Sequence, residues 1–299
     1  MLKRWAMKPS KPFSEGFTLI ECLIVLSISS MIITGLFAVY LNIKTNYLKN
    51  TAMQEILEDI HFVTVWLDRA VQGAGYLGLS SWRNTQVYSH EKNQWITTPV
   101  VLLNEQDSHL PENIREKMKP NTQAIEIQQM DFKLVSLSQL AYIGETAIEV
   151  LDNKEEQTVH WENGDSIIVA SSGHAEINRI VSIAQESNQR KMLYLQWPLK
   201  SEYPEGSYVG PYRDRIYFVG NTGRNFLDGK PIYGLYVYTE AGMTEEVSEL
   251  ISNIIFWAEG GQDLARLALL KAKITLTVPY LINGKQFSKE MEYDIAFRE

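Results

Sequence analysis

Cysteine is nearly absent from this chain. Its 299 residues include a single cysteine, Cys22. One cysteine cannot form an intrachain disulfide, so the fold must be held by packing and hydrogen bonds. Cys22 also lies inside a long apolar run, where it is unavailable for chemistry in an aqueous site.

Basic side chains are too few to balance the acidic ones. There are 28 Lys and Arg residues against 36 Asp and Glu residues, which gives a net charge of −8. This excess argues against a general binder of nucleic acids or anionic lipid surfaces, because contacts with phosphates need a cationic face. We therefore expect no nucleic-acid partner.

The sequence motifs of catalysis are missing as well. There is no Gly-x-Ser-x-Gly, no Walker loop and no zinc motif. Gly73-Ala-Gly75-Tyr-Leu-Gly78 has the spacing of a dinucleotide fingerprint, but it follows a predicted helix rather than a strand, so we interpret it as a helix cap and turn. Five histidines show no metal-ligand spacing: His61, His90, His109, His160 and His174. The sequence thus predicts a protein that is not an enzyme and has no cofactor or metal.

Two features leave a binding role open. Glu155-Glu156 and Glu245-Glu246 are most simply solvated charges, with a structural calcium site as the alternative. The stretch from Tyr203 to Tyr238 holds nine aromatic residues. Such residues most often pack a sheet, but they could instead bind sugars or stack bases, for instance at Tyr212 and Arg213. Three arginines accompany them: Arg213, Arg215 and Arg224.

A long apolar run occupies residues 17–41 and carries one charge, Glu21. As a helix it would be about 37 Å long, enough to cross roughly 30 Å of hydrocarbon. A cleaved secretory signal is the alternative, but no A-x-A-like site of small residues follows the run. Four basic residues precede it and place the N-terminus in the cytoplasm by the positive-inside rule: Lys3, Arg4, Lys8 and Lys11.

The residues at the start of this run resemble a known processing site. Gly16-Phe17-Thr18-Leu19-Ile20-Glu21, between a short basic leader and the apolar run, is similar to the cleavage site of type IV prepilins and type II secretion pseudopilins. The resemblance implies that a prepilin peptidase cleaves between Gly16 and Phe17 and methylates Phe17. Loss of residues 1–16 removes four basic residues and one acidic residue, which leaves 24 against 35 and a net charge of −11.

Glu21 would be costly in a membrane. A carboxylate in hydrocarbon costs about 2.5–3.5 kcal/mol on insertion scales, whereas a paired buried charge is tolerable. The resemblance implies that Glu21 meets the N-terminal amine of a neighbouring subunit and sets the register of assembly. The alternative is that Glu21 pairs with the amine of its own Phe17.

Proline and glycine are both missing from residues 42–72, which predicts that the helix continues from Phe17 to about Gln72. Apolar residues recur there at the three-and-four spacing of one buried face. They are Met53, Ile56, Leu57, Ile60, Val63, Leu67, Ala70 and Val71.

Beyond Ser80 the pattern predicts mostly short strands. Asn283-Gly284 predicts a tight hairpin, and Pro279 predicts an edge position or a bulge. Glu245–Trp257 and Leu264–Leu270 stay open between helix and strand. The predicted strands are Ile96–Leu103, Ala124–Val135, Ala147–Leu151, Ser166–Ala170, Ile177–Ile183, Met192–Trp197, Arg215–Val219, Gly234–Tyr238, Lys271–Ile282 and Lys285–Phe297.

These elements predict an α+β, pilin-like fold, in which a long N-terminal transmembrane α-helix continues into a helix packed on a mainly antiparallel β-sheet domain. The expected domains are a cleaved leader (1–16), a transmembrane half (17–41), a periplasmic half of the helix (42–72) and a β-rich globular domain (73–299).

The segment from Leu67 to Gly78 is similar to the end of the long helix in PilW-type minor pilins, and Leu79 stands where many of them carry cysteine. This resemblance implies a minor pilin that takes part in the priming and assembly of type IV pili. Its partners would be other minor pilins, the major pilin, the prepilin peptidase and the inner-membrane assembly platform. It would cross the bacterial inner membrane once, with a periplasmic C-terminal domain, before entering the fibre or its tip. The alternatives are a J-type pseudopilin of type II secretion and a pilus-tip adhesin.

Overall fold

The structure is a computed structural model, and it describes residues 18–78, 80–151, 159–187, 190–239, 242–258 and 269–296. The chain divides into two compact units, Met1–Thr51 and Ala52–Glu299. The helix α1 (Leu19–Gln72) contributes to both. This confirms the prediction of one uninterrupted helix through the segment without proline and glycine.

In the second unit, α1 buries one stripe of side chains. Each residue of the stripe has another member three or four positions away, as expected for one face of a helix. Leu57, which we predicted on this face, is 50% exposed. The prediction was wrong for Leu57 because it follows Ile56 around the helix and points past the edge of the stripe. The buried residues are Ala52, Ile56, Ile60, Val63, Thr64, Leu67 and Val71.

The helix ends as predicted at the glycine-rich stretch. The backbone N–H of Gly73 donates to the carbonyl of Arg69 at 3.1 Å and closes the last turn. Gly75 then adopts a left-handed conformation, with φ of 73°. A Cβ there would lie 2.9 Å from atoms of both Pro99 and Trp82, so the turn requires glycine.

Seventeen strands follow or accompany the helix in the described residues. They are β1 (Tyr76–Leu77), β2 (Ser80–Ser81), β3 (Gln86–Ser89), β4 (Gln94–Ile96), β5 (Val100–Asn104), β6 (Gln123–Met130), β7 (Val135–Leu137), β8 (Ala147–Leu151), β9 (Ser166–Ala170), β10 (His174–Ser187), β11 (Arg190–Leu195), β12 (Tyr208–Asn225), β13 (Pro231–Tyr238), β14 (Thr244–Ser248), β15 (Ile251–Ala258), β16 (Leu269–Ile282) and β17 (Lys285–Ala296). Two short helices stand among them, η1 (Trp82–Asn84) and α2 (Glu112–Lys117).

Most of these strands form one twelve-stranded sheet with β12 at its centre. The first residues of β12 pair with β9, and the residues from Tyr212 onward pair with β6 and β13. β12 therefore joins two parts of the sheet. Of the ladders described, β3 with β10 is parallel and the others are antiparallel.

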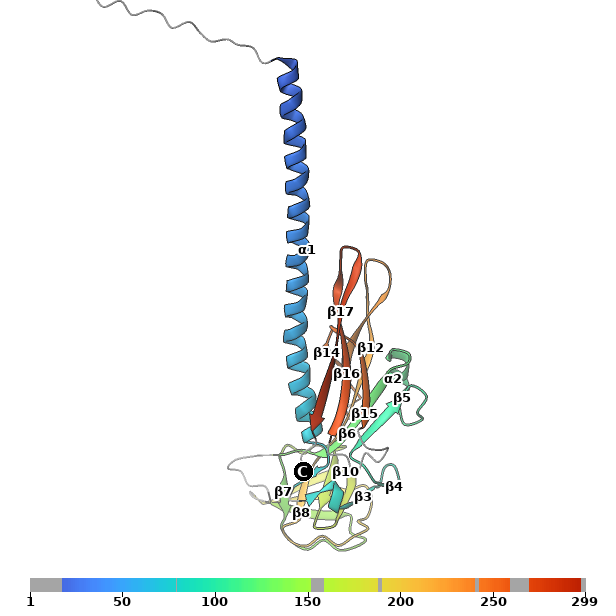
Figure 1. Ribbon diagram of the computed structural model, residues 1–299. Helices are drawn as coiled ribbons and strands as arrows, with labels where there is room; N and C mark the ends of the chain where they lie inside the picture. Colours follow the sequence, from blue (N-terminus) through green and yellow to red (C-terminus); the bar gives the residue numbers. More distant parts are fainter. Residues whose placement is uncertain are drawn as a thin grey trace, which may run out of the picture. The chain divides into compact units, whose positions relative to one another are not determined.

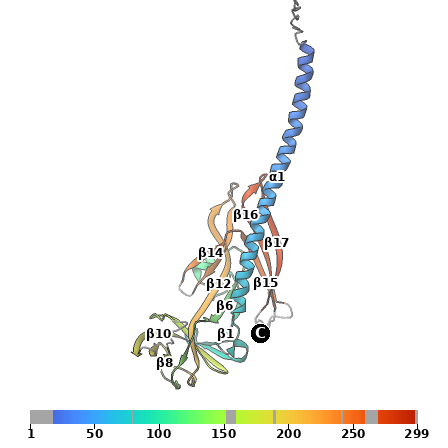
Figure 2. The same cartoon turned by 90° about the vertical axis from the view of Figure 1, so that its left-hand side faces the viewer.

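A second sheet has the order β15-β16-β17. Asn283 and Gly284 connect its last two strands with φ angles of 53° and 74°, which are typical of the predicted tight hairpin. Pro279 lies within a shift of register between Thr277 and Leu281, so the bulge that we predicted is present. Figures 1 and 2 both show this sheet alongside the C-terminal part of α1.

The predicted α+β fold class is confirmed, with corrections to individual strands. Ile96–Leu103 is not one strand, because Pro99 lies between β4 and β5 and has no backbone N–H. Ala124–Val135 is also wrong as one strand, because the backbone of Lys133 turns to donate to the side chain of Asp131 between β6 and β7. Glu245–Trp257 falls on two strands, β14 and β15, and residues 264–268 lie outside the described residues. The helix α2 and the strand β3 were not predicted.

Candidate functional site

The N-terminal end of α1 is the candidate site for processing and assembly. Of the three residues that the sequence assigns to it, Gly16 and Phe17 lie outside the described residues, and Glu21 is in the first turn of α1. The Glu21 carboxylate accepts hydrogen bonds from the backbone N–H and the hydroxyl of Thr18, both at 2.9 Å. The backbone N–H of Glu21 in turn donates to the Thr18 hydroxyl oxygen at 3.4 Å.

This reciprocal pair is a capping box, in which a Thr at the N-cap and a Glu three residues later satisfy each other's backbone N–H groups. The sequence Thr18-Leu-Ile-Glu21 carries that signature, which our sequence analysis missed. Glu21 therefore has a structural role within its own chain, because its carboxylate helps to cap the N-terminus of α1.

From Cys22 to Leu41 the helix carries no charged side chain on any face. Three hydroxyl side chains in this part of the helix donate to backbone carbonyls of the preceding turn: Ser27 to Leu23 at 2.8 Å, Ser30 to Ser27 at 3.1 Å and Thr34 to Ser30 at 2.7 Å. Large apolar side chains from Leu19 to Leu41 are exposed in the first unit. Within the described residues, α1 is the one helix long and apolar enough to cross a membrane by its length and composition.

Two histidines of the second unit, His90 and His174, have partners within the protein. The Nε2 atom of His90 lies 2.7 Å from Oε2 of Glu176, and both side chains are buried. The Nε2 atom of His174 lies 2.7 Å from the carbonyl oxygen of Glu202. Among the residues that the structure describes, no group of three or more His, Cys, Asp and Glu could hold a metal ion.

Tyr212 and Arg213, which we considered as ligand-binding residues, are also engaged internally. Tyr212 is buried and its hydroxyl donates to Asp214 at 3.3 Å. Arg213 donates through Nε and Nη2 to one carboxylate oxygen of Asp131, at 3.1 and 3.0 Å. These contacts favour the interpretation that the aromatic stretch packs the sheet.

Other rings of the stretch pack in the same way. Phe218 stacks on Tyr236 with their centroids 5.7 Å apart. Tyr217 contacts Trp66 of α1 edge to face at 4.8 Å. Such aromatic pairs each contribute about 0.5–1.5 kcal/mol beyond the area that they bury.

A partly buried cluster of charges lies beside Tyr212 and was not predicted. The ammonium of Lys92 lies 2.9 Å from Glu126 and 3.6 Å from Asp214. Burial and the nearby Glu126 carboxylate raise the pKa of Asp214 to about 7, against the opposing effect of Lys92. Burial also raises the pKa of Tyr212. Two carboxylates, of which Glu126 is buried and Asp214 is partly exposed, thus share one lysine.

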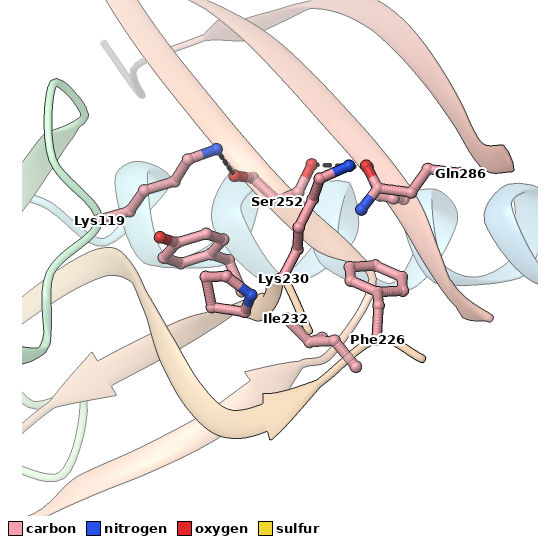
Figure 3. A pocket seen from close by; sticks show the side chains of 9 residues that line it. Lys119, Phe226, Lys230, Ile232, Ser252 and Gln286 are labelled. Carbon is pink, nitrogen blue, oxygen red and sulfur yellow. Dashed lines mark hydrogen bonds between the residues drawn. The ribbon is translucent and has the colours of Figure 1, made fainter. Parts of the chain in front are cut away.

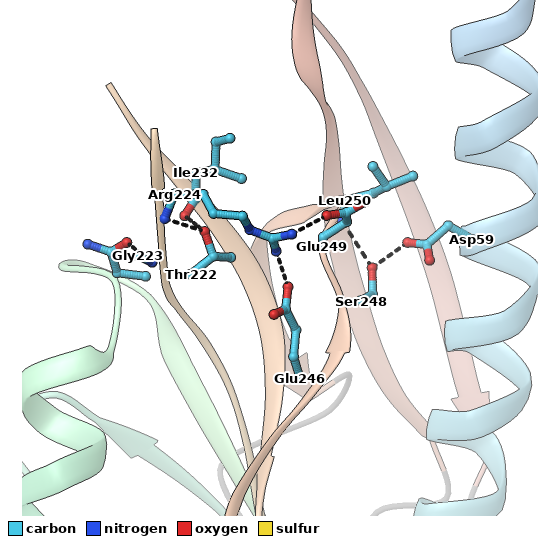
Figure 4. Close-up of polar contacts among 10 residues, drawn as sticks. Asp59, Thr222, Gly223, Arg224, Ile232, Glu246, Ser248, Glu249 and Leu250 are labelled. Carbon is cyan, nitrogen blue, oxygen red and sulfur yellow. Dashed lines mark hydrogen bonds and ion pairs between the residues drawn. The ribbon is translucent and has the colours of Figure 1, made fainter. Parts of the chain in front are cut away.

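The twelve-stranded sheet and the sheet β15-β16-β17 are each joined to α1 by hydroxyl groups that donate to carboxylates of the helix. Ser248 donates to Asp59 at 2.5 Å, and Figure 4 shows this contact between the strand and the helix. Burial raises the pKa of Asp59, although the bond from Ser248 opposes the shift. Two tyrosines make equivalent contacts: Tyr280 with Glu55 at 2.8 Å and Tyr293 with Asp68 at 2.5 Å.

Arg224 binds two carboxylates beside these contacts. It donates to Glu249 at 2.6 Å and also pairs with Glu246, as Figure 4 shows. Glu245 and Glu246 are both exposed, in agreement with our interpretation of them as solvated charges, and Arg224 pairs with Glu246 at the surface. Glu155-Glu156 lies outside the described residues.

Comparison with protein families finds the prokaryotic N-terminal methylation motif at residues 13–37. This match supports a type IV pilin-like or pseudopilin-like protein. Together with the apolar helix, it fits a pilin that is anchored in a membrane. The motif covers the end of the helix that Glu21 caps, and it suggests a structural protein rather than an enzyme.

The remaining comparisons add little. No curated protein matches the chain. Among solved structures, the phage phi92 endosialidase matches with a TM-score of 0.19 and 7% sequence identity, over 56% of this chain and 32% of that chain. The chain thus spans about a third of that protein's length, and a similarity this weak supports no conclusion about fold or function.

Proposed function

We propose that this chain is a minor pilin of the PilW type that takes part in the priming and assembly of type IV pili. The observation that carries the proposal is the methylation motif at residues 13–37, which leads into a helix of 54 residues. The apolar half of that helix suits a membrane or a fibre core, and the other half packs on a large sheet. The C-terminal segment of the helix, from Leu67 to Gly78, supports the PilW assignment by its similarity to that family.

In this proposal the prepilin peptidase cleaves between Gly16 and Phe17 and methylates Phe17. The N-terminus lies in the cytoplasm and the second unit in the periplasm. The cleaved chain then joins other minor pilins and the major pilin at the inner-membrane assembly platform. Glu21 accepts the N-terminal amine of a neighbouring subunit, because an unpaired carboxylate is costly at that depth.

The test separates processing from assembly. We expect Gly16→Ala to leave an uncleaved precursor, because the peptidase must approach the backbone at a residue without a side chain. Mass spectrometry of the purified protein would show an N-terminus at Met1 instead of Phe17. Normal processing of this variant, or a natural N-terminus beyond Leu41, would contradict the proposal.

Glu21 needs a control that keeps its local role. Glutamine also satisfies a capping box, so Glu21→Gln retains the bond to Thr18 and removes the charge, whereas Glu21→Val removes both. If the charge receives a neighbour's amine, both variants are processed normally but fail to co-purify with other pilins. Glu58→Gln, at an exposed position of the same helix, serves as the matched control. Normal assembly of the Glu21→Gln variant would mean that Glu21 acts only as a helix cap. Co-purification of the unmodified chain with type II secretion pseudopilins would favour the J-type alternative.

A further inference from the structure

A cavity of about 400 Å³ opens in the second unit where β13 and the loop before it face β15, β16 and β17. Figure 3 shows its lining, with Lys119, Lys230 and Gln286 among the labelled side chains. The volume lies in the range of small-ligand sites. Of the described residues that line it, none is acidic, although the chain as a whole has a net charge of −8.

Lys119 is the main charged group of this cavity. Its ammonium donates to the carbonyl of Ser252 at 2.7 Å and lies 4.8 Å from the centre of the Tyr233 ring. Burial lowers the pKa of Lys119, and in the described part of the chain no carboxylate forms an ion pair with it. A half-buried ammonium whose hydrogen-bond acceptor is neutral favours the approach of an anion.

The rest of the lining combines an apolar wall with neutral polar groups. Phe226 and Ile232 are 8% and 6% exposed and form part of the wall. The hydroxyls of Ser252 and Thr277 lie 2.9 Å apart. Gln286 adds an exposed amide at the rim. These groups can exchange hydrogen bonds with hydroxyl groups of a ligand.

Lys230 supplies a second positive charge at the rim. Its side chain is 66% exposed, and its ammonium lies 3.0 Å from Asp228. An exposed ion pair of this kind contributes little stability, so Lys230 can turn toward a ligand at small cost. The cavity thus offers two ammonium groups, aromatic and aliphatic surface, and several neutral hydrogen-bonding groups.

We propose that this cavity binds a small carboxylate-bearing sugar of the uronic acid type. The carboxylate would lie between Lys119 and Lys230, the apolar face of the sugar ring on Tyr233 and Phe226, and the sugar hydroxyls toward the polar groups. A bare inorganic anion would leave the apolar wall unused. The site lies entirely within the second unit, so the proposal does not depend on the pilus assignment.

The test uses the full chain in detergent micelles and titrates it with D-glucuronate, followed by saturation-transfer NMR. We expect saturable binding of glucuronate. D-glucose and inorganic phosphate should each bind at least about tenfold more weakly, because glucose lacks the carboxylate and phosphate lacks the sugar ring. Equal binding of glucose would exclude a role for the charge. Stronger binding of phosphate, or no saturable binding of glucuronate, would overturn the proposal.

Lysine variants test whether glucuronate binds in this cavity. Lys119→Met keeps the apolar stem and removes the charge, and it should weaken glucuronate binding by about tenfold to a hundredfold, the effect of losing a charged hydrogen bond. Lys117→Met is the matched control, because Lys117 also lies over a tyrosine ring, at 3.6 Å from the centre of Tyr236, but does not line the cavity. If Lys119→Met does not fold, the exposed Lys230→Met provides the test in its place. Equal weakening by the control variant would contradict this location.

Discussion

Asp214 illustrates how a single residue of this protein depends on its surroundings. It lies on β12 among Lys92, Glu126 and Tyr212, and its pKa is raised to about 7 by burial and by the nearby Glu126. The ordinary pKa of this carboxyl is 3.8. Between these two pH values the folded chain holds a proton that the unfolded chain releases.

Stability should therefore fall as the pH rises across this window. The contribution of Asp214 to the free energy of unfolding is fully present below pH 4, and it is lost as the pH rises through about 7. We expect Asp214→Asn to remove this part of the pH dependence, because the neutral side chain does not titrate. Urea unfolding of both proteins from pH 4 to pH 8 would measure it. Parallel pH profiles for the two proteins would contradict the assignment.

A variant of Lys92 tests the same titration of Asp214 from the opposite charge. Its positive charge opposes the raised pKa of Asp214, so Lys92→Met should shift the loss of stability to higher pH. The same titration with urea measures that shift. A shift to lower pH would mean that the carboxylate responds to other groups.

At the scale of elements, α1 packs in the second unit through one narrow stripe of buried side chains, and apolar side chains outside the stripe stay exposed. Ile56 is fully buried, whereas the adjacent Leu57 is half exposed. The two side chains are similar in volume and apolar character, so they form a matched pair that differs in burial alone.

We expect Ile56→Ala to lower the free energy of unfolding by about 2–5 kcal/mol, the usual effect of a cavity in a packed core. Leu57→Ala should change it by no more than about 0.5 kcal/mol. Thermal or urea unfolding of the detergent-solubilised chain, followed by the fluorescence of Trp66 and the other tryptophans, measures both. Equal losses from the two variants would show that α1 is packed on a wider face.

Several elements could be predicted from the sequence because their signals are local. The absence of proline and glycine from residues 42–72 predicted the long helix, and Asn283-Gly284 predicted the hairpin. The length of β12 could not be predicted, because Gly210 and Pro211 interrupt its apolar pattern. A Cβ at position 210 would lie 2.6 Å from the side chain of Met130 on β6. Close packing against β6 therefore requires glycine at this position.

The contacts that define the polar interior are not visible in the sequence, because they join distant segments. Lys92 meets Glu126 and Asp214 only after β6 and β12 have paired. The hydroxyl of Tyr293 and the carboxylate of Asp68 are 225 positions apart. By contrast, the capping box at Thr18 and Glu21 is a local pattern, and a search for that signature could have found it.

The molecule as a whole is held without a covalent crosslink. Cys22 is the only cysteine, and it lies in the first unit. A native disulfide in a small secreted domain typically contributes about 2–5 kcal/mol, and here the packing of the β-sheets and of the buried stripe of α1 must replace it.

We therefore expect a reducing agent to leave the thermal midpoint of unfolding unchanged. Calorimetry with and without dithiothreitol measures this, and a non-reducing gel controls for dimers linked through Cys22. A lower midpoint under reducing conditions would indicate that an intermolecular disulfide contributes to stability.

The contacts of Tyr280 and Tyr293 with α1 have a consequence for biosynthesis. The ribosome makes the helix first, but the strands β16 and β17 that supply these hydroxyls come last. The hydrogen bonds of Glu55 and Asp68 to these strands can therefore form only when nearly the whole chain has been made. Pairings this distant along the chain are also slow to form. The interval between synthesis of the helix and closure of the sheet is thus the time at which the chain is most open to aggregation, to proteases and to the chaperones that would cover it.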